Sequence, residues 1–168
     1  MTETTTLPTR AEVPLERTWN LDSIFPTPAD WDAAGQTLTG LLPALSAYQG
    51  RLGQSPQVLL EFIQHYQDVA ILVGKIGTYA SSATAVDTLN QEASARAGQA
   101  RSLMARFQAA VAFFEPELVA IGFDKLRQWM EETPDLAFFT HYVQRLEDRQ
   151  AHIRSGEVEE TLALTSDA

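Results

Sequence analysis

The chain has 168 residues, of which 45% are hydrophobic and 20% charged, a composition typical of a globular domain with a hydrophobic core. Twelve lysines and arginines against 22 aspartates and glutamates give a net charge of −10, so nucleic acids and anionic membranes are poor candidate partners. The absence of cysteine excludes disulfides, thiolate zinc sites and cysteine nucleophiles.

The N-terminal segment does not have the pattern of a secretory signal. It lacks a basic stretch followed by an apolar one, so a cytoplasmic location is expected. Residues 1–15 contain threonines and prolines without periodicity, which predicts a flexible leader. Residues 69–86 are the most apolar stretch, but Lys75 and many small or hydroxyl side chains favour a buried helix over a membrane span.

Helix signals dominate from residue 16 onward, and no strand pattern competes with them. Trp19 to Phe25 predict a short turn that Asn20 can cap. Thr27, Pro28 and Asp30 then predict a helix start, because a hydroxyl can cap the first turn and proline and an acid suit its first positions. The helix is expected to run to about residue 48 and to bend at Pro43. Its predicted inward side chains are Trp31, Leu38, Leu41, Leu42 and Leu45.

The next helix begins at Ser55 and Pro56, which repeat the same start signal. Apolar side chains then recur at three- and four-residue spacing, at Leu59, Phe62, Ile63, Tyr66, Val69, Ala70, Val73 and Ile76. A stripe of small residues, Ala70, Gly74, Gly77 and Ser81, is expected to let another helix approach closely. A cofactor beside the stripe is the weaker alternative, since no ligand residues accompany it.

A third, long helix is predicted from a capping box formed by Thr88 and Gln91. Pro116 is expected to interrupt or kink it. Its predicted apolar positions are Leu103, Met104, Phe107, Ala110, Val111 and Phe114.

Gly122 and Asp124 mark a stop and a new start, which predicts a short helix over residues 124–132. Asp135 opens a further helix, and a last one is expected to begin near Ser155. The inward face of the helix after Asp135 is predicted to carry Leu136, Phe139, Tyr142, Val143 and Leu146. The sequence therefore predicts an all-α fold of antiparallel helical hairpins, packed as a multi-helix bundle over residues 16–168.

Motifs for catalysis, cofactors and metals are missing from this sequence. Neither a P-loop, a G-x-S-x-G nor a G-x-G-x-x-G is present, and none of His65, His141 and His152 begins H-E-x-x-H. Asp148 and His152 can share a helical face, but zinc needs three or four protein ligands, so a surface pair is the preferred interpretation.

Paired acids and hydroxyls are likewise interpreted as surface features. Glu131–Glu132 and Glu159–Glu160 are adjacent in sequence, and adjacent side chains on a helix point apart, so they do not form a carboxylate dyad. Ser81 and Ser82 have no histidine nearby in sequence. We therefore predict no catalytic, cofactor-binding or metal-binding residue in this chain, whose residues alone indicate only a helical domain.

The stretch "VPLERTWNLDSIFPTPADWDA", residues 13–33, resembles the N-terminal signature of the oligoendopeptidase F family, relatives of the thimet-type zinc metallopeptidases. The matching positions are Arg10, Pro14, Thr18, Trp19, Leu21, Ile24, Phe25, Pro26, Thr27 and Trp31. Three later segments are also similar to the family: "TYASSATAVDTLNQEA" (78–93), "FFEPEL" (113–118) and residues 134–163, where Ile153–Arg154 departs from the family pattern. The resemblance thus covers residues 10–165.

The resemblance implies where that family carries its catalytic residues. The zinc ligands and the general-base glutamate lie on H-E-x-x-H and a downstream glutamate, in a C-terminal helical domain. That region is absent here, so no catalytic residue is carried over and the chain alone is expected to be inactive and zinc-free. The parent enzyme would hydrolyse short peptides with zinc-activated water. This chain would wall the cavity that admits them, with the missing catalytic domain as its partner.

The aromatic residues of the opening stretch are interpreted as anchors rather than as a ligand site. Trp19 and Phe25 are expected to fix the entering segment across the helices, and Trp31 to face the first hairpin. Two further hypotheses remain beside the peptidase domain. One is a free-standing helical adaptor that binds peptides in a groove. The other is a structural bundle that forms homo-oligomers through the small-residue stripe.

Overall fold

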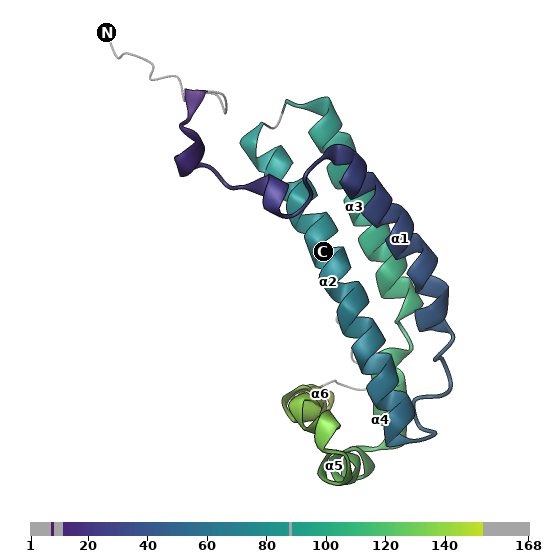
Figure 1. Cartoon of the computed structure of the whole chain (residues 1–168). Coiled ribbons are helices and arrows are strands. Elements are labelled where there is room, and N and C mark those ends of the chain that lie inside the picture. Colours follow the sequence, from purple (N-terminus) through teal and green to yellow (C-terminus); the bar gives the residue numbers. More distant parts are fainter. Residues whose placement is uncertain (1–7, 9–11, 88, 153–168) are drawn as a thin grey trace, which may run out of the picture. The chain divides into compact units, whose positions relative to one another are not determined.

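The computed structural model describes residue 8, residues 12–87 and residues 89–152, without the side chains of residues 15, 151 and 152. Its α-helices, labelled in Figure 1, are α1 (Pro28–Ser46), α2 (Pro56–Val86), α3 (Gln91–Ala110), α4 (Phe114–Ile121), α5 (Phe123–Glu132) and α6 (Thr140–His152). The 3₁₀ helices are η2 (Leu15–Arg17), η3 (Leu21–Ser23) and η4 (Pro134–Phe139). Over these residues the chain forms no strand, and the predicted all-α fold is confirmed.

The chain divides into two compact units. The first contains Met1–Gln49 and Phe62–Ala112, and therefore α1, most of α2 and α3. The second contains Gly50–Glu61 and Phe113–Ala168, with the first turns of α2 and the helices from α4 to α6. Whether residues 16–168 act as one domain stays a prediction, and the predicted leader and the helix near residue 155 fall mostly outside the described residues.

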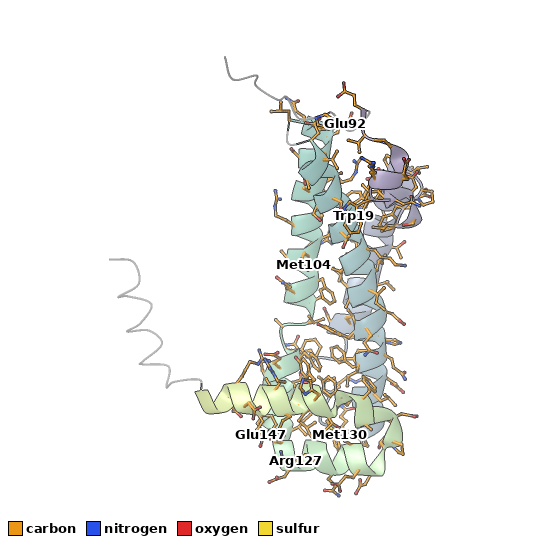
Figure 2. All side chains as sticks on the ribbon, turned by 90° about the vertical axis from the view of Figure 1, so that its left-hand side faces the viewer. Trp19, Glu92, Met104, Arg127, Met130 and Glu147 are labelled. Atoms are coloured by element: carbon orange, nitrogen blue, oxygen red, sulfur yellow. The ribbon has the colours of Figure 1, made fainter. Side chains whose placement is uncertain are left out.

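The first unit is an up-down-up arrangement of three helices lying side by side (Figures 1 and 2). α1 and α3 pack against each other. The Trp31 indole Nε1 of α1 donates a hydrogen bond to the Ile76 carbonyl of α2 at 3.0 Å, and the ring centroids of Tyr66 (α2) and Phe107 (α3) lie 5.5 Å apart. Further buried residues of this unit are Leu38, Leu42, Leu45, Phe62, Val69, Val73, Ala80, Ala93 and Ala100.

The predicted start of the first helix is confirmed. Thr27 is the N-cap of α1: its hydroxyl accepts from the Asp30 backbone N–H at 3.2 Å, while the Asp30 carboxylate accepts from the Thr27 N–H at 3.0 Å. α1 continues through Pro43 and ends at residue 46. The inward assignment of Leu41 was wrong, because this side chain is 40% exposed while Leu38 and Leu42 hold the buried positions one turn apart.

Two boundaries differ from the prediction. α3 begins with Asn90 as N-cap, whose side chain accepts from the Ala93 N–H at 3.0 Å, rather than with the expected capping box of Thr88 and Gln91. The long helix ends at residue 110, and Pro116 lies in the first turn of α4 instead of interrupting it. Proline fits there because the first-turn N–H groups have no partner inside the helix.

The second unit is built around short helices. Gly122 has φ +90°, a conformation that favours glycine, and it ends α4 and begins α5, as predicted. The predicted helix after Asp135 is a 3₁₀ segment, η4, followed by α6. Rings of Phe114, Phe139 and Tyr142 stack with centroids 4.6–6.0 Å apart. Other buried residues here are Leu118, Leu126, Trp129, Met130, Leu136, Val143 and Leu146.

By length and composition alone, α2 is apolar enough to cross a membrane: its most apolar 18-residue window has a mean hydropathy of 1.3. The core helix of a water-soluble protein meets the same criterion. Only 28% of this window is buried within the chain, however. The interpretation of residues 69–86 as a buried helix is therefore correct for one face of α2 only.

The burial of α1 predicts a contrast between two neighbouring leucines. Leu38→Ala removes a fully buried side chain and should lower the free energy of unfolding by about 2–5 kcal/mol. Leu41→Ala removes a partly exposed one and should cost under about 1 kcal/mol. Urea denaturation of both variants followed by circular dichroism measures the difference. Equal losses would contradict the observed orientation of α1.

Candidate functional site

The histidines are not assembled into a reactive group in the part of the chain that the structure describes. The His65 Nδ1 lies 3.0 Å from the Tyr48 hydroxyl, within hydrogen-bond distance, on the first unit. His141 lies exposed on α6, and the side chain of His152 is outside the described residues. No three histidine, aspartate or glutamate side chains come together among the described residues.

The other candidates weighed on the sequence occupy ordinary helical positions. Asp148, the expected partner of His152, accepts a hydrogen bond from the Gln144 amide at 3.0 Å, and Glu132 accepts one from Gln128 at 2.7 Å. The Ser81 hydroxyl donates to the Thr78 carbonyl of its own helix at 3.2 Å. Glu159 and Glu160 lie outside the described residues, so their interpretation stays untested.

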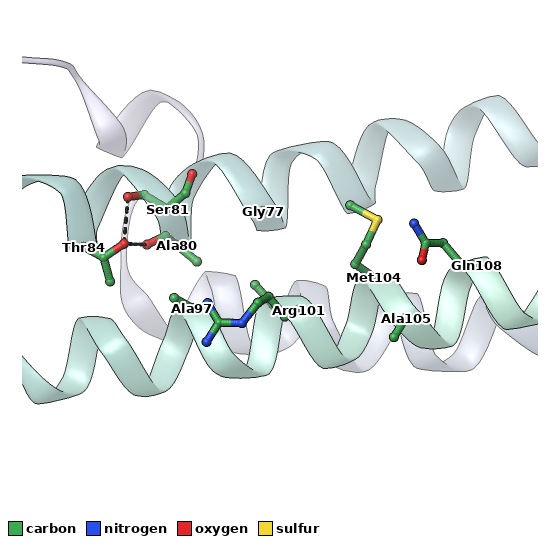
Figure 3. A pocket seen from close by; sticks show the side chains of 10 residues that line it. Gly77, Ala80, Ser81, Thr84, Ala97, Arg101, Met104, Ala105 and Gln108 are labelled. Atoms are coloured by element: carbon green, nitrogen blue, oxygen red, sulfur yellow. Dashed lines mark hydrogen bonds between the residues drawn. The ribbon is translucent and has the colours of Figure 1, made fainter. Parts of the chain in front are cut away.

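A shallow groove of about 290 Å³ runs between α2 and α3 (Figure 3). Gly77, Ala80, Ser81 and Thr84 line it from α2. From α3 it is lined by Ala97, Ala100, Arg101, Met104, Ala105 and Gln108. No histidine or carboxylate is among these lining residues, so the groove offers no acid–base pair for catalysis.

The small-residue stripe faces open space rather than a closely packed helix. A Cβ added at Gly74 or Gly77 would meet nothing within 4 Å, and Gly74 and Ser81 are exposed. Among the described residues no helix packs closely on Gly74 or Gly77, so the expected close approach of another helix stays a prediction. The tight contact is at Gly35 of α1, where an added Cβ would lie 3.3 Å from Leu103 of α3. Sequence spacing identified small residues but could not tell which of them face a neighbour.

Two of the three aromatics that were predicted as anchors are buried. Phe25 is buried with its ring edge-on to Tyr79 at 5.6 Å, and Trp31 is buried against α2, as expected. Trp19 is 87% exposed and lies at the surface (Figure 2), so its assignment as an anchor was wrong. It borders two hollows that also involve Leu21. Aromatic character alone does not show which side of a turn faces the helices.

The "FFEPEL" segment supplies two carboxylates that sequence reasoning did not single out. Glu115 accepts hydrogen bonds from the Tyr142 hydroxyl and from the Arg149 guanidinium, each at 2.8 Å, and so ties α4 to α6. Glu117 accepts from the backbone N–H groups of Gly50 and Leu52. Because positions two apart lie on different sides of a helix, the E-x-E spacing was a signal for two separate contacts.

The Arg149 hydrogen bond is the largest influence on the Glu115 carboxyl and holds its pKa below the ordinary range; partial burial opposes the shift, and the Tyr142 hydroxyl adds to it. A second cluster lies on α5, where Arg127 donates to Asp124 at 2.6 Å and to Glu147 of α6 at 2.7 Å (Figure 2). These carboxylates, chiefly Asp124, raise the pKa of Arg127. Both clusters join helices and serve the structure of the unit.

Because the pKa of Glu115 is lowered in the folded chain, its stabilising contribution is present above the ordinary pKa of glutamate, about 4.3, and is lost as pH falls through the folded value. The unchanged chain should therefore lose more stability between pH 7 and pH 3 than Glu115→Gln. Since the carboxylate is partly exposed, the difference should be at most about 1 kcal/mol. Urea denaturation at both pH values measures it.

Glu131→Gln, which removes an exposed carboxylate of α5, is the matched control and should follow the unchanged chain. An identical pH dependence for the Glu115 variant and the unchanged chain would show that the contact with Arg149 does not stabilise the fold.

A sequence-family match, curated relatives and a solved structure all connect this chain with the same group of peptidases. The sequence family described as Oligopeptidase F matches residues 117–168. The chain is 32% identical over 161 residues to oligopeptidase PepF of Bacillus subtilis, covering 96% of this chain and 24% of that protein. It is 30% identical over 158 residues to the plasmid oligoendopeptidase F of Lactococcus lactis subsp. cremoris, covering 92% of this chain and 26% of that protein.

Among solved structures, the crystal structure of oligoendopeptidase-F from Enterococcus faecium matches with a TM-score of 0.69 and 30% sequence identity, over 82% of this chain and 27% of that one. The chain thus spans about a quarter of the length of the relatives that it matches. Fold, sequence and opening signature point the same way. The chain belongs to the oligoendopeptidase F family and corresponds to its N-terminal part.

Proposed function

We propose that this chain is the N-terminal, non-catalytic domain of an oligoendopeptidase F-like zinc metallopeptidase that hydrolyses short peptides. One observation carries the proposal: 96% of the chain aligns with only 24% of a relative whose name is that of an oligopeptidase. The other three-quarters of that length leaves ample room for the catalytic residues that this sequence lacks.

The zinc and the reaction are assigned to polypeptide outside these 168 residues. The sequence has no H-E-x-x-H helix, the arrangement that places two histidines and a glutamate around zinc. The donors that are present do not fit a zinc site either, because the His65 Nδ1 faces the Tyr48 hydroxyl and no cluster of three ligands exists among the described residues. The chain's own role is therefore structural.

In this proposal, helices α1, α2 and α3 form part of the wall of the cavity that admits short peptides and excludes folded proteins. No histidine or carboxylate lines the space between α2 and α3, so these helices suit a wall better than a reaction centre. The catalytic domain is then a covalent partner of this chain, and short peptides are the substrates of the whole. We also propose a cytoplasmic location, which cell fractionation tests.

The proposal predicts that the 168-residue chain, purified and dialysed, contains no stoichiometric zinc and does not cleave short fluorogenic peptides. The polypeptide extended by the in-frame sequence after Ala168 should contain H-E-x-x-H, bind zinc and cleave such peptides in a chelator-sensitive way. Metal analysis and a fluorescence assay provide the two readouts. Stoichiometric zinc together with chelator-sensitive turnover in the 168-residue chain would refute the non-catalytic assignment.

A further inference from the structure

We infer that the uncovered face of α2, together with the groove that it forms with α3, is a docking surface for an α-helix that carries a carboxylate. We place this helix in a further part of the same protein, which would correspond to the three-quarters of the relatives' length that this chain does not cover. The inference rests on the proposal that this chain is part of a longer peptidase, and it assigns the residues through which the two parts meet.

The first argument is the mismatch between the apolarity of α2 and its burial. The most apolar window of α2 meets the hydropathy of a membrane span, yet only 28% of it is buried. Val69, Val73 and Ala80 face the core of the first unit. At 100° per residue, Ile71, Gly74 and Thr78 fall on the opposite side of the helix, and Ile71 is 60% exposed. Covering the exposed Ile71 side chain would gain free energy.

The second argument is the space available at this face. Added Cβ atoms at Gly74 and Gly77 would meet nothing within 4 Å, and the adjoining groove is bordered by Ala97, Ala100 and Ala105 of α3. Arg101, Met104 and Gln108 also line the groove, but small side chains predominate, so a helix can lie there at the 8–10 Å interaxial distance of packed helices. The surface thus fits a helix more closely than it fits a small ligand.

The third argument is charge. The chain as a whole carries −10, but between residues 69 and 110 it has Lys75, Arg96, Arg101 and Arg106. Asp87 and Glu92 are the acids of this range. Arg96 lies over the Trp31 ring at 5.6 Å and Arg106 donates to Thr39 at 3.3 Å, so both are engaged inside the first unit.

Lys75 and Arg101 are different, because neither has an ion-pair partner among the described residues. Arg101 borders the groove (Figure 3), whereas at 100° per residue Lys75 falls on the side of α2 away from the groove residues Gly77 and Thr84. A carboxylate on the docked helix would pair with Arg101, and partial removal of water would strengthen the attraction.

The net charge argues against a second copy of this chain as the occupant. In a two-fold symmetric dimer through this face, two bodies of charge −10 would approach each other. The part of the matched relatives that this chain does not cover is long enough to provide a helix, since the chain covers only 24–27% of them.

Thiol labelling tests the inference, because the chain has no cysteine of its own. Thr78→Cys places a thiol at the centre of the exposed face of α2, and Thr37→Cys is the matched control, an exposed threonine inside α1. In the 168-residue chain both should label rapidly. In the longer polypeptide, Thr78→Cys should label at least about tenfold more slowly, because the docked helix must first detach, while Thr37→Cys should be unchanged. Mass spectrometry reads the label on each peptide.

A charge variant adds a second readout. In the longer polypeptide, Arg101→Glu should restore rapid labelling of Thr78→Cys, whereas Arg101→Lys should retain the protection. Restoration by both variants, or by neither, would overturn the assignment of a carboxylate to the docked helix.

The peptidase assay, run on the same samples, separates this inference from the proposed function. Peptide cleavage with rapid labelling at residue 78 overturns the docking surface and leaves the proposed function intact. Slow labelling without cleavage supports the docking surface and removes the proposed function. Protection of the 168-residue chain that appears at high concentration, or with phospholipid vesicles, identifies a second copy or a membrane as the occupant and overturns the inference.

Discussion

The hydrogen bond from the Trp31 indole to the Ile76 carbonyl is the contact on which the first unit depends. A buried indole N–H needs an acceptor, and a carbonyl on the core side of α2 provides it. The bond fixes the position of α1 along α2, and the capping box at Thr27 sets the start of α1 four residues earlier. With these two constraints satisfied, Leu38, Leu42 and Leu45 all reach the core shared with α3.

Sequence patterns were sufficient where local chemistry decides the structure. The caps at Thr27 and Ser55 and the turn at Gly122 follow from hydrogen bonds and φ angles that few residue types provide, and all three were predicted. The family resemblance also came from local order, since its opening signature lies within about twenty residues. The all-helical class followed from apolar periodicity alone.

Tertiary contacts decided the rest. Leu41 is apolar but exposed, because apolar periodicity identifies a helix without showing how much of its surface the neighbouring helices cover. Trp19 lies in the segment before α1 and is also exposed. The glycines of α2 suggested close packing, whereas the structure places the tight approach at Gly35 of α1. Glu115 and Glu117 were overlooked because the partners of each are distant in sequence. The prediction of no catalytic residue rested on missing sequence motifs, and motifs are recognised without a structure.

The exposed apolar face of α2 has a further consequence during synthesis. Ribosomes make polypeptides from the N-terminus, and N-terminal domains generally fold first. If the proposed larger enzyme is correct, α2 and α3 emerge and pair while the segment that covers them is still untranslated. For that interval Ile71 and its neighbours are open to nascent chains and chaperones. The net charge of −10 then keeps neighbouring copies apart, so the acidity of this chain serves its solubility on the ribosome.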